Sequence, residues 1–219
     1  PFHRISRLSH HNIPERVLAL DAELQSHLVG IEDVRAFSET ARARFEAAPL
    51  WRGSPYKDVR DALAATDERL ELLDLVADYQ RLKQSLGVVE FADQLREAVR
   101  LVGRVPDVGR ELRRRFKVVL LDEYQDTSSA QAALLRALFS GPDASHGRGH
   151  AVTAVGDPHQ AIYGWRGAAA SNILQFANDF PSADGLPAAS FALTVNRRSG
   201  PVILAAANDL AAGLRADPL

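Results

Sequence analysis

The amino-acid sequence predicts an α/β fold, in which a small parallel sheet with flanking helices follows an all-helical region. Two observations support this prediction. Apolar residues recur every three or four positions through residues 14–102, which is the period of amphipathic helices. From residue 105 onward, short apolar runs alternate with helical segments, which is the order expected of a parallel sheet.

Composition restricts the possible functional classes. The 219 residues carry a net charge of -2 and no cysteine, so a global basic field, disulfides and thiolate metal sites are excluded. No apolar run approaches the roughly 18 residues that a membrane span needs. The first residues lack the apolar core of a signal peptide, so a cytoplasmic location without membrane contact is expected. Methionine is absent, which suggests a processed chain or a piece of a longer one.

The helical region is predicted to contain helices over about 14–29, 31–48, 58–86 and 91–102. Pro14 lies near a first turn, and Gly87 ends the long helix. The histidines at 3, 10 and 11 lack further ligands at metal-binding spacing, so a polar terminus is expected there. The expected inward-facing residues include Val17, Leu24, Phe37, Leu73, Val76, Phe91, Leu95 and Val102.

Residues 118–121, 151–155 and 191–195 are the predicted strands, and helices over about 128–139, 168–179 and 201–214 follow them. The run from Val118 to Leu121 contains no polar position, which predicts a strand buried on both faces of the sheet. Because parallel strands end at the same edge, the polar residues after each strand are expected to converge there.

These polar residues have the composition of a phosphoryl-transfer site. Carboxylates can hold a metal ion and activate a water molecule, an amide can sense an anion, and arginines can stabilise developing charge. For residues 117–127 alone, a strand that ends in an ordinary polar turn is an equal alternative. The residues after the three strands are, in chain order, Asp122, Glu123, Gly156, Asp157, Gln160, Arg197 and Arg198.

The segment IYGWRG at 162–167 lies between the second and third predicted strands. Exposed aromatic rings beside arginine and glycine are what base stacking on single-stranded nucleic acid requires. The alternative for Tyr163 and Trp165 is packing in the core, where large aromatic residues are common.

Three motifs carry a resemblance to a known family. DEYQDT at 122–127, VGDPHQAIYGWRGA at 155–168 and LTVNRRS at 193–199 resemble motifs II, III and IV of the superfamily 1A DNA helicases, the UvrD/Rep/PcrA family, in order and spacing. Residues 78–95 and 112–116 resemble the segment that leads into motif II. The resemblance implies that residues 1–104 form a 1B-like helical region with connecting helices. Residues 105–219 would be the distal part of domain 1A, a partial RecA-like P-loop NTPase sheet.

The resemblance also implies roles for the nucleotide-site residues. Asp122 would ligate Mg²⁺ with Glu123 beside it, and Glu123 would be the general base for the hydrolytic water. Gln160 and Arg198 would contact the γ-phosphate of ATP. Arg197 stands where the family usually has a tyrosine that stacks on adenine, which suggests a cation over the adenine ring.

For the DNA site, the resemblance implies that Tyr163 and Trp165 stack on bases of the tracking strand and that Arg166 braces their loop. Asp126 and Asp157 would hold loop geometry.

No G-x-x-x-x-G-K-[ST] sequence occurs in the 219 residues, and helicase motifs V and VI are also missing. We therefore expect an internal fragment of an ATP-dependent DNA helicase, a hydrolase of DNA repair that moves 3′ to 5′, with the fragment inactive by itself. Expected partners are single- and double-stranded DNA, the rest of the parent chain and a second copy paired through the incomplete sheet. The alternative is a non-catalytic module that binds single-stranded DNA or a partner helicase.

Overall fold

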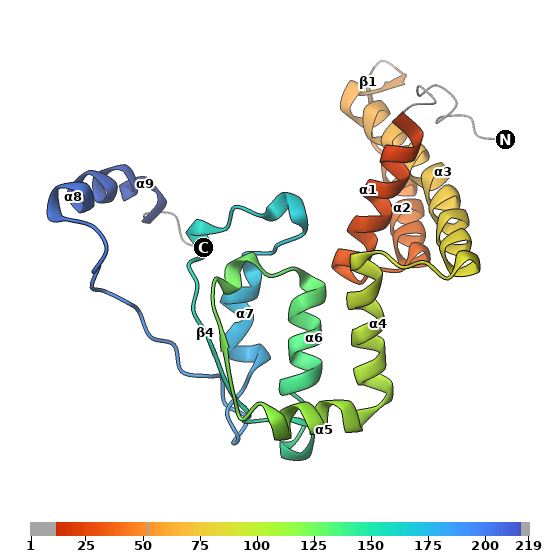
Figure 1. Ribbon diagram of the computed structural model, residues 1–219. Helices are drawn as coiled ribbons and strands as arrows, with labels where there is room; N and C mark the ends of the chain where they lie inside the picture. Colours follow the sequence, from red (N-terminus) through yellow and green to blue (C-terminus); the bar gives the residue numbers. More distant parts are fainter. Residues whose placement is uncertain (1–11, 52, 216–219) are drawn as a thin grey trace. The chain divides into compact units, whose positions relative to one another are not determined.

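The computed structural model describes residues 12–51 and 53–215, so the expectations for the histidines at 3, 10 and 11 lie outside the described residues. The chain divides into two compact units, Pro1–Ala188 and Ala189–Leu219, which we describe separately. The first unit combines helices with a small parallel sheet (Figure 1). This arrangement confirms a helix-rich mixed fold compatible with the predicted α/β class, whereas the predicted domain boundary after residue 104 stays a prediction.

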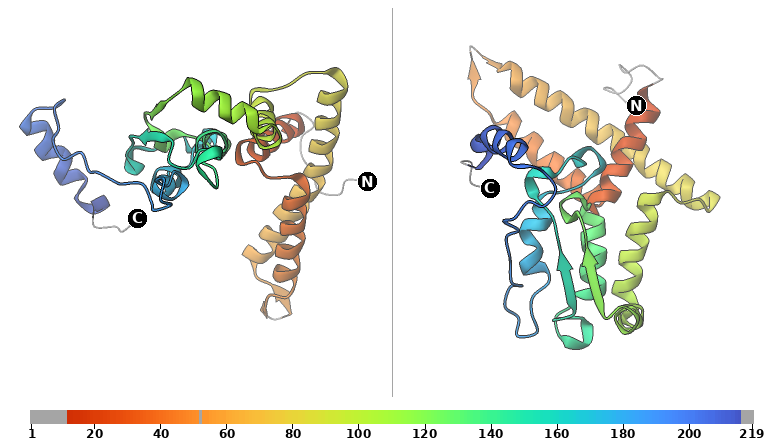
Figure 2. Two further views of the ribbon diagram at one scale, coloured as in Figure 1. Left: turned by 90° about the horizontal axis from the view of Figure 1, so that it is seen from below. Right: turned by 60° about the vertical axis from the view of Figure 1, so that its left-hand side comes forward.

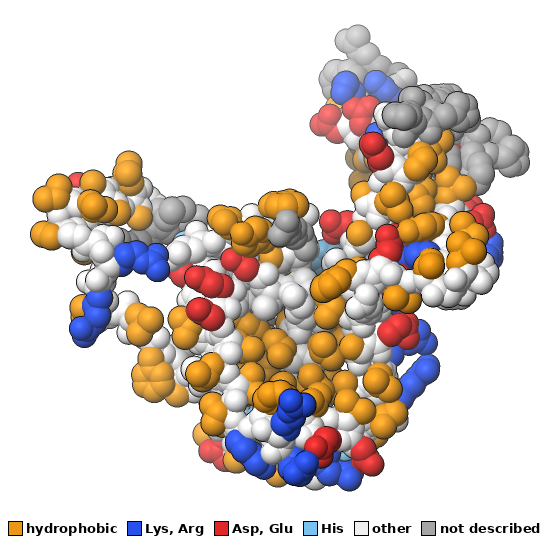
Figure 3. Space-filling view, viewed as in Figure 1, with side chains coloured by type: hydrophobic (Ala, Val, Ile, Leu, Met, Phe, Trp, Pro, Cys, Tyr) orange, Lys and Arg blue, Asp and Glu red, His pale blue; other side chains and the backbone are white. Residues whose placement is uncertain are grey.

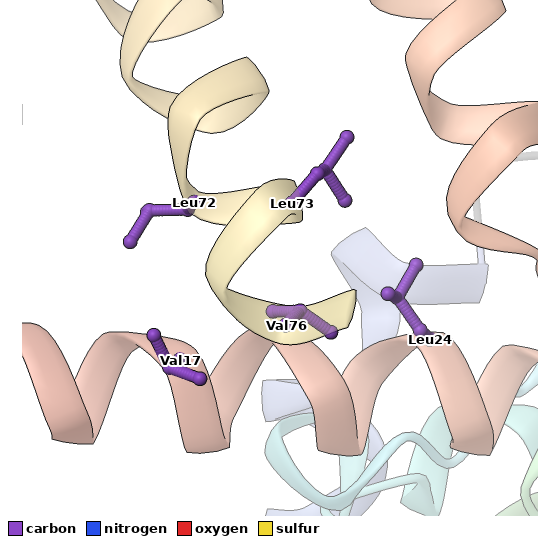
Figure 4. Packing of buried hydrophobic residues seen from close by; sticks show 5 residues of the cluster. All are labelled: Val17, Leu24, Leu72, Leu73 and Val76. Carbon is purple, nitrogen blue, oxygen red and sulfur yellow. The ribbon is translucent and has the colours of Figure 1, made fainter. Parts of the chain in front are cut away.

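Helices α1 (Asn12–His27), α2 (Ile31–Glu46) and α3 (Lys57–Leu86) confirm the predicted helical region. Their core consists of aliphatic side chains from α1 and α3, with Leu73 and Val76 0% exposed (Figure 4). Gly87 ends α3 in the left-handed conformation that glycine adopts without a steric penalty. The segment before α3 contains a short antiparallel pair, β1 (Leu50–Trp51) and β2 (Ser54–Pro55). Phe37 was expected to face inward, but it is 68% exposed on α2.

A buried ion cluster joins α1, α3 and α4 (Phe91–Arg104). The Nζ atom of Lys83 on α3 lies 2.6 Å from Asp21 Oδ2 and 2.8 Å from both Asp93 Oδ2 and Glu90 Oε2. The side chain of Asp21 is 1% exposed, and its Oδ1 accepts a further hydrogen bond from the Gln80 amide. Burial alone would lower the pKa of Lys83, but its hydrogen bonds to the three carboxylates outweigh burial and raise the pKa. The cluster therefore keeps a cation in the interior and fixes three helices to one another.

Two features of α4 and the following helix differ from expectation. Phe91 was predicted to face inward, but its side chain is 80% exposed. Phe91 is the first residue of α4, so only later turns of the helix can pack on its inward side. Helix α5 (Pro106–Arg115) was not predicted. Proline at the first helical position is compatible with a helix start. The Arg113 guanidinium also ties α5 to the carbonyl oxygens of Leu138 and Ser145, a contact that no local pattern reveals.

The sheet consists of β3 (Val118–Leu121) and β4 (Ala151–Ala154), which pair in parallel with Val118 opposite Ala151 and Leu121 opposite Ala154 (Figure 2). Helix α6 (Ser129–Phe139) follows β3, and its capping box is closed by Ser128 Oγ, which accepts from the Gln131 N–H. Helix α7 (Ser171–Asp179) follows β4 and the loops after it. These elements confirm the first two predicted strands and their helices.

The prediction that the first strand is buried on both faces is wrong. Val119 and Leu121 pack into the core with Tyr124, Phe139 and side chains of α6 and α7. Their neighbours Val118 and Leu120 are 61% and 76% exposed. Successive side chains of a strand point to opposite faces, and among the described residues of the first unit helices cover one face of this sheet.

In the second unit, the predicted strand over 191–195 is also wrong. The segment belongs to no strand in the described chain, and Phe191, Leu193 and Val195 are 86%, 87% and 69% exposed. A strand needs a hydrogen-bonded neighbour, and no described segment pairs with this one. The helices α8 (Pro201–Leu210) and α9 (Ala212–Arg215) follow, as expected. No helix in the described ranges is long and apolar enough to cross a membrane.

Replacing Lys83 by Met should lower the free energy of unfolding by about 3–5 kcal/mol at pH 7, because it leaves buried carboxylates without their cation. The matched control is Lys57→Met, which removes an exposed ion pair with Asp61. The side chains of Lys57 and Asp61 are 78% and 62% exposed. That control should cost less than about 1 kcal/mol. Urea unfolding of both variants measures the difference, and equal losses would contradict the role of the cluster.

The same cluster should make stability depend on acid pH. Burial alone would raise the pKa of Asp93, but hydrogen bonds from Lys83 and from the backbone N–H of Glu90 outweigh it and lower the pKa. The stabilisation by Asp93 is therefore present above the unfolded-state pKa of about 3.9 and is lost as pH falls through the folded-state value. In Lys83→Met, this acid-side loss should be smaller.

Candidate functional site

The first polar tip of the sheet begins directly after β3. Asp122 and Glu123 are both exposed, and Asp122 Oδ1 accepts a hydrogen bond of 3.0 Å from the Glu123 N–H. The backbone of Glu123 has φ 50° and ψ 43°, a left-handed conformation that is uncommon outside glycine. This turn leads into the 3-10 turn η2 (Tyr124–Asp126) and leaves both carboxylates at the edge of the sheet.

Tyr124 anchors this turn in the core. Its side chain is 0% exposed, its ring packs edge-on against Phe176 at 5.4 Å, and its N–H donates to the Val155 carbonyl at 3.0 Å. Burial, together with the negative charge of Asp179, raises the pKa of the Tyr124 hydroxyl to about 12. The phenol therefore stays neutral and acts as packing rather than as an acid or base.

The amide of Gln125 connects the first tip to the second. Gln125 is 1% exposed, its Nε2 donates to Glu123 Oε2 at 2.8 Å, and its Oε1 accepts from the Asp157 N–H at 3.1 Å. Gly156 makes room for it, since a Cβ atom there would lie 2.4 Å from Gln125 Oε1. Sequence reasoning did not single out Gln125, because its partner lies in a distant loop. The sequence feature that could have indicated this contact is Gly156, which leaves space for the Gln125 amide.

The second tip is organised by Asp157. Its Oδ1 accepts from the His159 N–H at 2.9 Å, and its Oδ2 accepts from Gln160 Nε2 at 2.8 Å. Gln160 itself is exposed at the end of the 3-10 turn η4 (Pro158–Gln160). Because Leu121 and Ala154 pair in parallel, both tips lie at the same edge of the sheet. The structure therefore brings the acidic pair and the Asp157–Gln160 pair to one edge.

Backbone N–H groups in and just after the aromatic loop, residues 162–167, attach it to the first tip. The Ile162 N–H donates to Asp126 Oδ1 at 3.4 Å, and the Ala169 N–H donates to the Thr127 carbonyl at 3.0 Å. Tyr163 and Trp165 are 38% and 71% exposed, with ring centroids 6.4 Å apart. The alternative that these two rings are core residues is therefore wrong. Arg166 ends the 3-10 turn η5 (Gly164–Arg166), and its side chain lies outside the described part of the structure.

A hollow of about 640 Å³ borders this aromatic loop. Its walls come from α1, from the first turn of α4, where Phe91 lies, and from the start of α6. The exposed ring of Phe91 therefore belongs to the same surface as Tyr163 and Trp165, which the helical periodicity could not indicate. The hollow is lined by Ala22, Glu23, Ser26, Phe91, Ala92, Leu95, Asp126, Ser128, Gln131, Tyr163 and Trp165.

The third predicted group of site residues lies in the second unit. Asn196 Oδ1 accepts from the N–H groups of Arg198 and Ser199 at 2.9 and 2.8 Å, which closes a tight turn before α8. Arg197 and Arg198 are both exposed. Their place beside the other two tips stays a prediction.

The acidic pair fits one mode of metal binding. No group of three or more histidine, aspartate or glutamate side chains in the described ranges could hold a metal ion. Mg²⁺ commonly takes one or two carboxylates and completes its shell with water and substrate phosphates. The exposed carboxylates of Asp122 and Glu123 match that requirement.

The UvrD/REP helicase N-terminal domain family matches residues 11–181 of the chain. DNA helicase II of Escherichia coli (strain K12) is 41% identical over 132 residues, which cover 60% of this chain and 17% of the relative. The ATP-dependent DNA helicase PcrA of Bacillus subtilis (strain 168) is 37% identical over 137 residues, covering 63% and 17%. PcrA of Staphylococcus aureus (strain Mu50 / ATCC 700699) is 36% identical over 147 residues, covering 67% and 18%. The chain thus spans 17–18% of the length of these relatives.

Replacing Gly156 by Ala should lower the free energy of unfolding by about 1–3 kcal/mol, because the new methyl group displaces the buried Gln125 amide from its partners. Gly164→Ala is the matched control in the neighbouring loop, since no atom lies within 4 Å of its added Cβ. We expect that control to change stability by less than about 0.5 kcal/mol. Urea unfolding compares the two variants, and the proposed bridge is refuted if Gly156→Ala is as stable as the control.

Proposed function

The chain belongs to the UvrD/REP helicase family, and from this premise we propose that it is part of an ATP-dependent DNA helicase that moves 3′ to 5′ along single-stranded DNA. Residues 1–104 would supply the 1B-like region, and residues 105–219 the distal part of the RecA-like domain. The remaining parts would come from the rest of the parent chain. The observation that supports this function best is the Gln125 bridge, which joins a pair of exposed carboxylates to a second polar tip at the same sheet edge.

The proposed chemistry uses the residues in distinct roles. Glu123 is the general base, because its exposed carboxylate is oriented by the Gln125 amide and can accept a proton from an attacking water. Asp122 would hold Mg²⁺, and the bound ion supplies neutralisation of charge on the ATP phosphates. Gln160 would contact the γ-phosphate, with its side chain positioned by Asp157. The assignment of Arg197 and Arg198 to the nucleotide rests on the resemblance alone.

The proposed coupling to DNA follows the hydrogen bonds between the two loops. Asp126 ends the turn η2 and Thr127 follows it, and these two residues accept hydrogen bonds from Ile162, Ala169 and Asn172. A displacement of the turn on nucleotide hydrolysis would therefore be transmitted to the loop of Tyr163 and Trp165. These rings would stack on bases and change their grip during each cycle.

Stacking predicts a specific mutational result. Trp165→Ala and Tyr163→Ala should each weaken binding of a thymidine oligonucleotide by about 1–3 kcal/mol, because each removes one aromatic surface for a base. Phe37→Ala is the matched control, since Phe37 is 68% exposed on α2, away from this loop. Fluorescence anisotropy measures binding. Unchanged affinity in both loop variants would refute the proposed DNA surface.

The chain by itself is expected to release phosphate from ATP no faster than buffer does, because its 219 residues contain no G-x-x-x-x-G-K-[ST] loop to hold the triphosphate. Enzymatic turnover at about 1–10³ s⁻¹ would contradict this proposal. In the parent protein, Glu123→Gln should lower kcat by about 10²–10⁴, the usual contribution of a general base. Asp61→Asn, an exposed substitution on α3, serves as the control.

The second candidate function is a non-catalytic module that binds single-stranded DNA or a helicase partner. The exposed rings of Tyr163 and Trp165 would serve such a module equally well. The Glu123→Gln experiment decides between the two, because a non-catalytic parent protein would show no ATP turnover for the substitution to remove.

We also propose that the chain self-associates through its incomplete sheet. Val118 and Leu120 leave an exposed apolar strip on β3, which supports pairing with another copy. Sedimentation velocity over a range of concentrations should show a dimer that Leu120→Lys disrupts. Leu82→Lys, at a leucine that is 54% exposed on α3, should leave the dimer intact. A monomer at every concentration would refute this proposal.

A further inference from the structure

A strongly basic hollow lies at the end of the sheet opposite the candidate nucleotide site. It has a volume of about 550 Å³ and opens beside the N-terminal ends of β3 and β4. Figure 3 shows Lys and Arg side chains gathered along this lower edge, where α5 lies in Figure 1. No acidic residue is among the lining residues, although the whole chain carries a net charge of -2. The basic lining residues are Arg110, Arg113, Arg114, Lys117, Arg148 and His150.

Two of these side chains are fixed by the fold. Arg113 Nη2 donates to the Ser145 carbonyl at 2.9 Å, and Nη1 donates to the Leu138 carbonyl. His150 Nε2 donates to the Phe116 carbonyl at 2.8 Å, and its ring stacks on Phe139 at 5.3 Å. Burial lowers the pKa of Arg113, and the nearby positive charge of Arg110 lowers it further. Cations are therefore crowded together here, which favours an anion between them.

The other cations are available to a ligand. Lys117 is exposed, and Arg148 is half-buried, with an Nε atom that has no hydrogen-bond partner in the described part of the chain. Arg110 pairs with Asp107 at 2.7 Å, with side chains 70% and 75% exposed, and Arg114 pairs with Glu111 in a similarly exposed position. Exposed pairs of this kind contribute little, so a phosphate can replace the carboxylates.

The other residues that line the hollow are small. Their side chains are no larger than serine, which leaves room for a phosphate group to approach the backbone. These small lining residues are Ala144, Ser145, Gly147, Gly149 and Ala151.

We propose that this hollow binds the phosphodiester backbone of double-stranded DNA, at a surface separate from the Tyr163–Trp165 loop. Arginine forks and a lysine match phosphate oxygens in geometry and charge. The single ring in the lining is that of His150, and it is already stacked on Phe139, so the hollow offers no platform for an unpaired base. Duplex DNA presents phosphates outward and keeps its bases paired, which matches this lining. The contact is therefore independent of base sequence and strongly dependent on salt.

The test is fluorescence anisotropy of the chain with a labelled blunt duplex over a series of salt concentrations. The double variant Arg110→Ala/Lys117→Ala removes exposed cations without touching the fixed Arg113. Each lost phosphate contact should make the slope of log affinity against log salt shallower by about 0.9. Over a ten-fold range of salt concentration, from about 0.1 M to about 1 M, this change amounts to about an eight-fold difference in affinity. Two duplexes of unrelated sequence should show the same loss.

The matched control is Arg81→Ala/Lys57→Ala. Arg81 pairs with Asp78 three residues earlier, as Arg110 pairs with Asp107, and both control residues lie on α3. The control should keep the affinity and the salt slope, and thermal unfolding should confirm that all variants are folded. An unchanged slope in Arg110→Ala/Lys117→Ala overturns the proposal. It is also overturned if that variant loses affinity for poly-glutamate but keeps its affinity for duplex, since the partner is then an acidic protein segment.

The outcome is independent of the proposed helicase function. Trp165→Ala should weaken binding of single strands and leave duplex binding by this hollow unchanged. A loss of duplex binding in Trp165→Ala equal to that in Arg110→Ala/Lys117→Ala would place both contacts on one surface and overturn the separation proposed here.

Discussion

The buried amide of Gln125 hydrogen-bonds to both polar loops at the C-terminal edge of the sheet, through Glu123 on one side and the Asp157 backbone on the other. A neutral amide suits this place because it donates and accepts at once. A carboxylate would repel Glu123, and an apolar side chain would leave a backbone N–H without its partner, at a cost of about 1–3 kcal/mol. The requirement extends to Gly156, where any side chain would meet the amide oxygen. The geometry of both loops therefore depends on one side chain and the space opposite it.

The helical region is held by a different kind of interaction. Lys83 and its carboxylates connect α3 to α1 and α4, and α4 carries Phe91 to the hollow beside the aromatic loop. Buried ion pairs often stabilise a protein no more than apolar packing does, but they tolerate few alternative arrangements. We interpret the cluster as a constraint on how these helices align. The cluster matters for the site because it positions α1 and α4, which form two walls of that hollow.

The sequence predicted the elements that have a local signal. Helical periodicity predicted α1 to α4, and the helix expected over about 128–139 corresponds to α6. The errors arise where the structure of a segment depends on a segment that is distant in the sequence. The run Val118–Leu121 is equally apolar whether helices cover one face of the sheet or both, so the sequence of the strand does not reveal how many of its faces are buried. Residues 191–195 have strand composition but no neighbour to pair with in the described chain. The contacts of Lys83 and Gln125 link distant segments, and a single sequence carries no pattern for such pairs.

The left-handed backbone of Glu123 explains how adjacent residues reach opposite environments. Glu123 is exposed while Tyr124 is 0% exposed, so the chain must turn sharply between the strand and the core. Such a conformation costs a non-glycine residue about 1–2 kcal/mol. The burial of Tyr124 and the hydrogen bonds from Gln125 and to Asp122 offset that cost.

This turn orients the carboxylates before any ligand arrives, which is the preorganisation that catalytic groups need. Four carboxylates, those of Asp122, Glu123, Asp126 and Asp157, belong to the two tips and repel a bare triphosphate. For the proposed function, the tips would therefore orient the general base and relay its movement to the aromatic loop, while affinity for the nucleotide would have to come from cationic groups elsewhere.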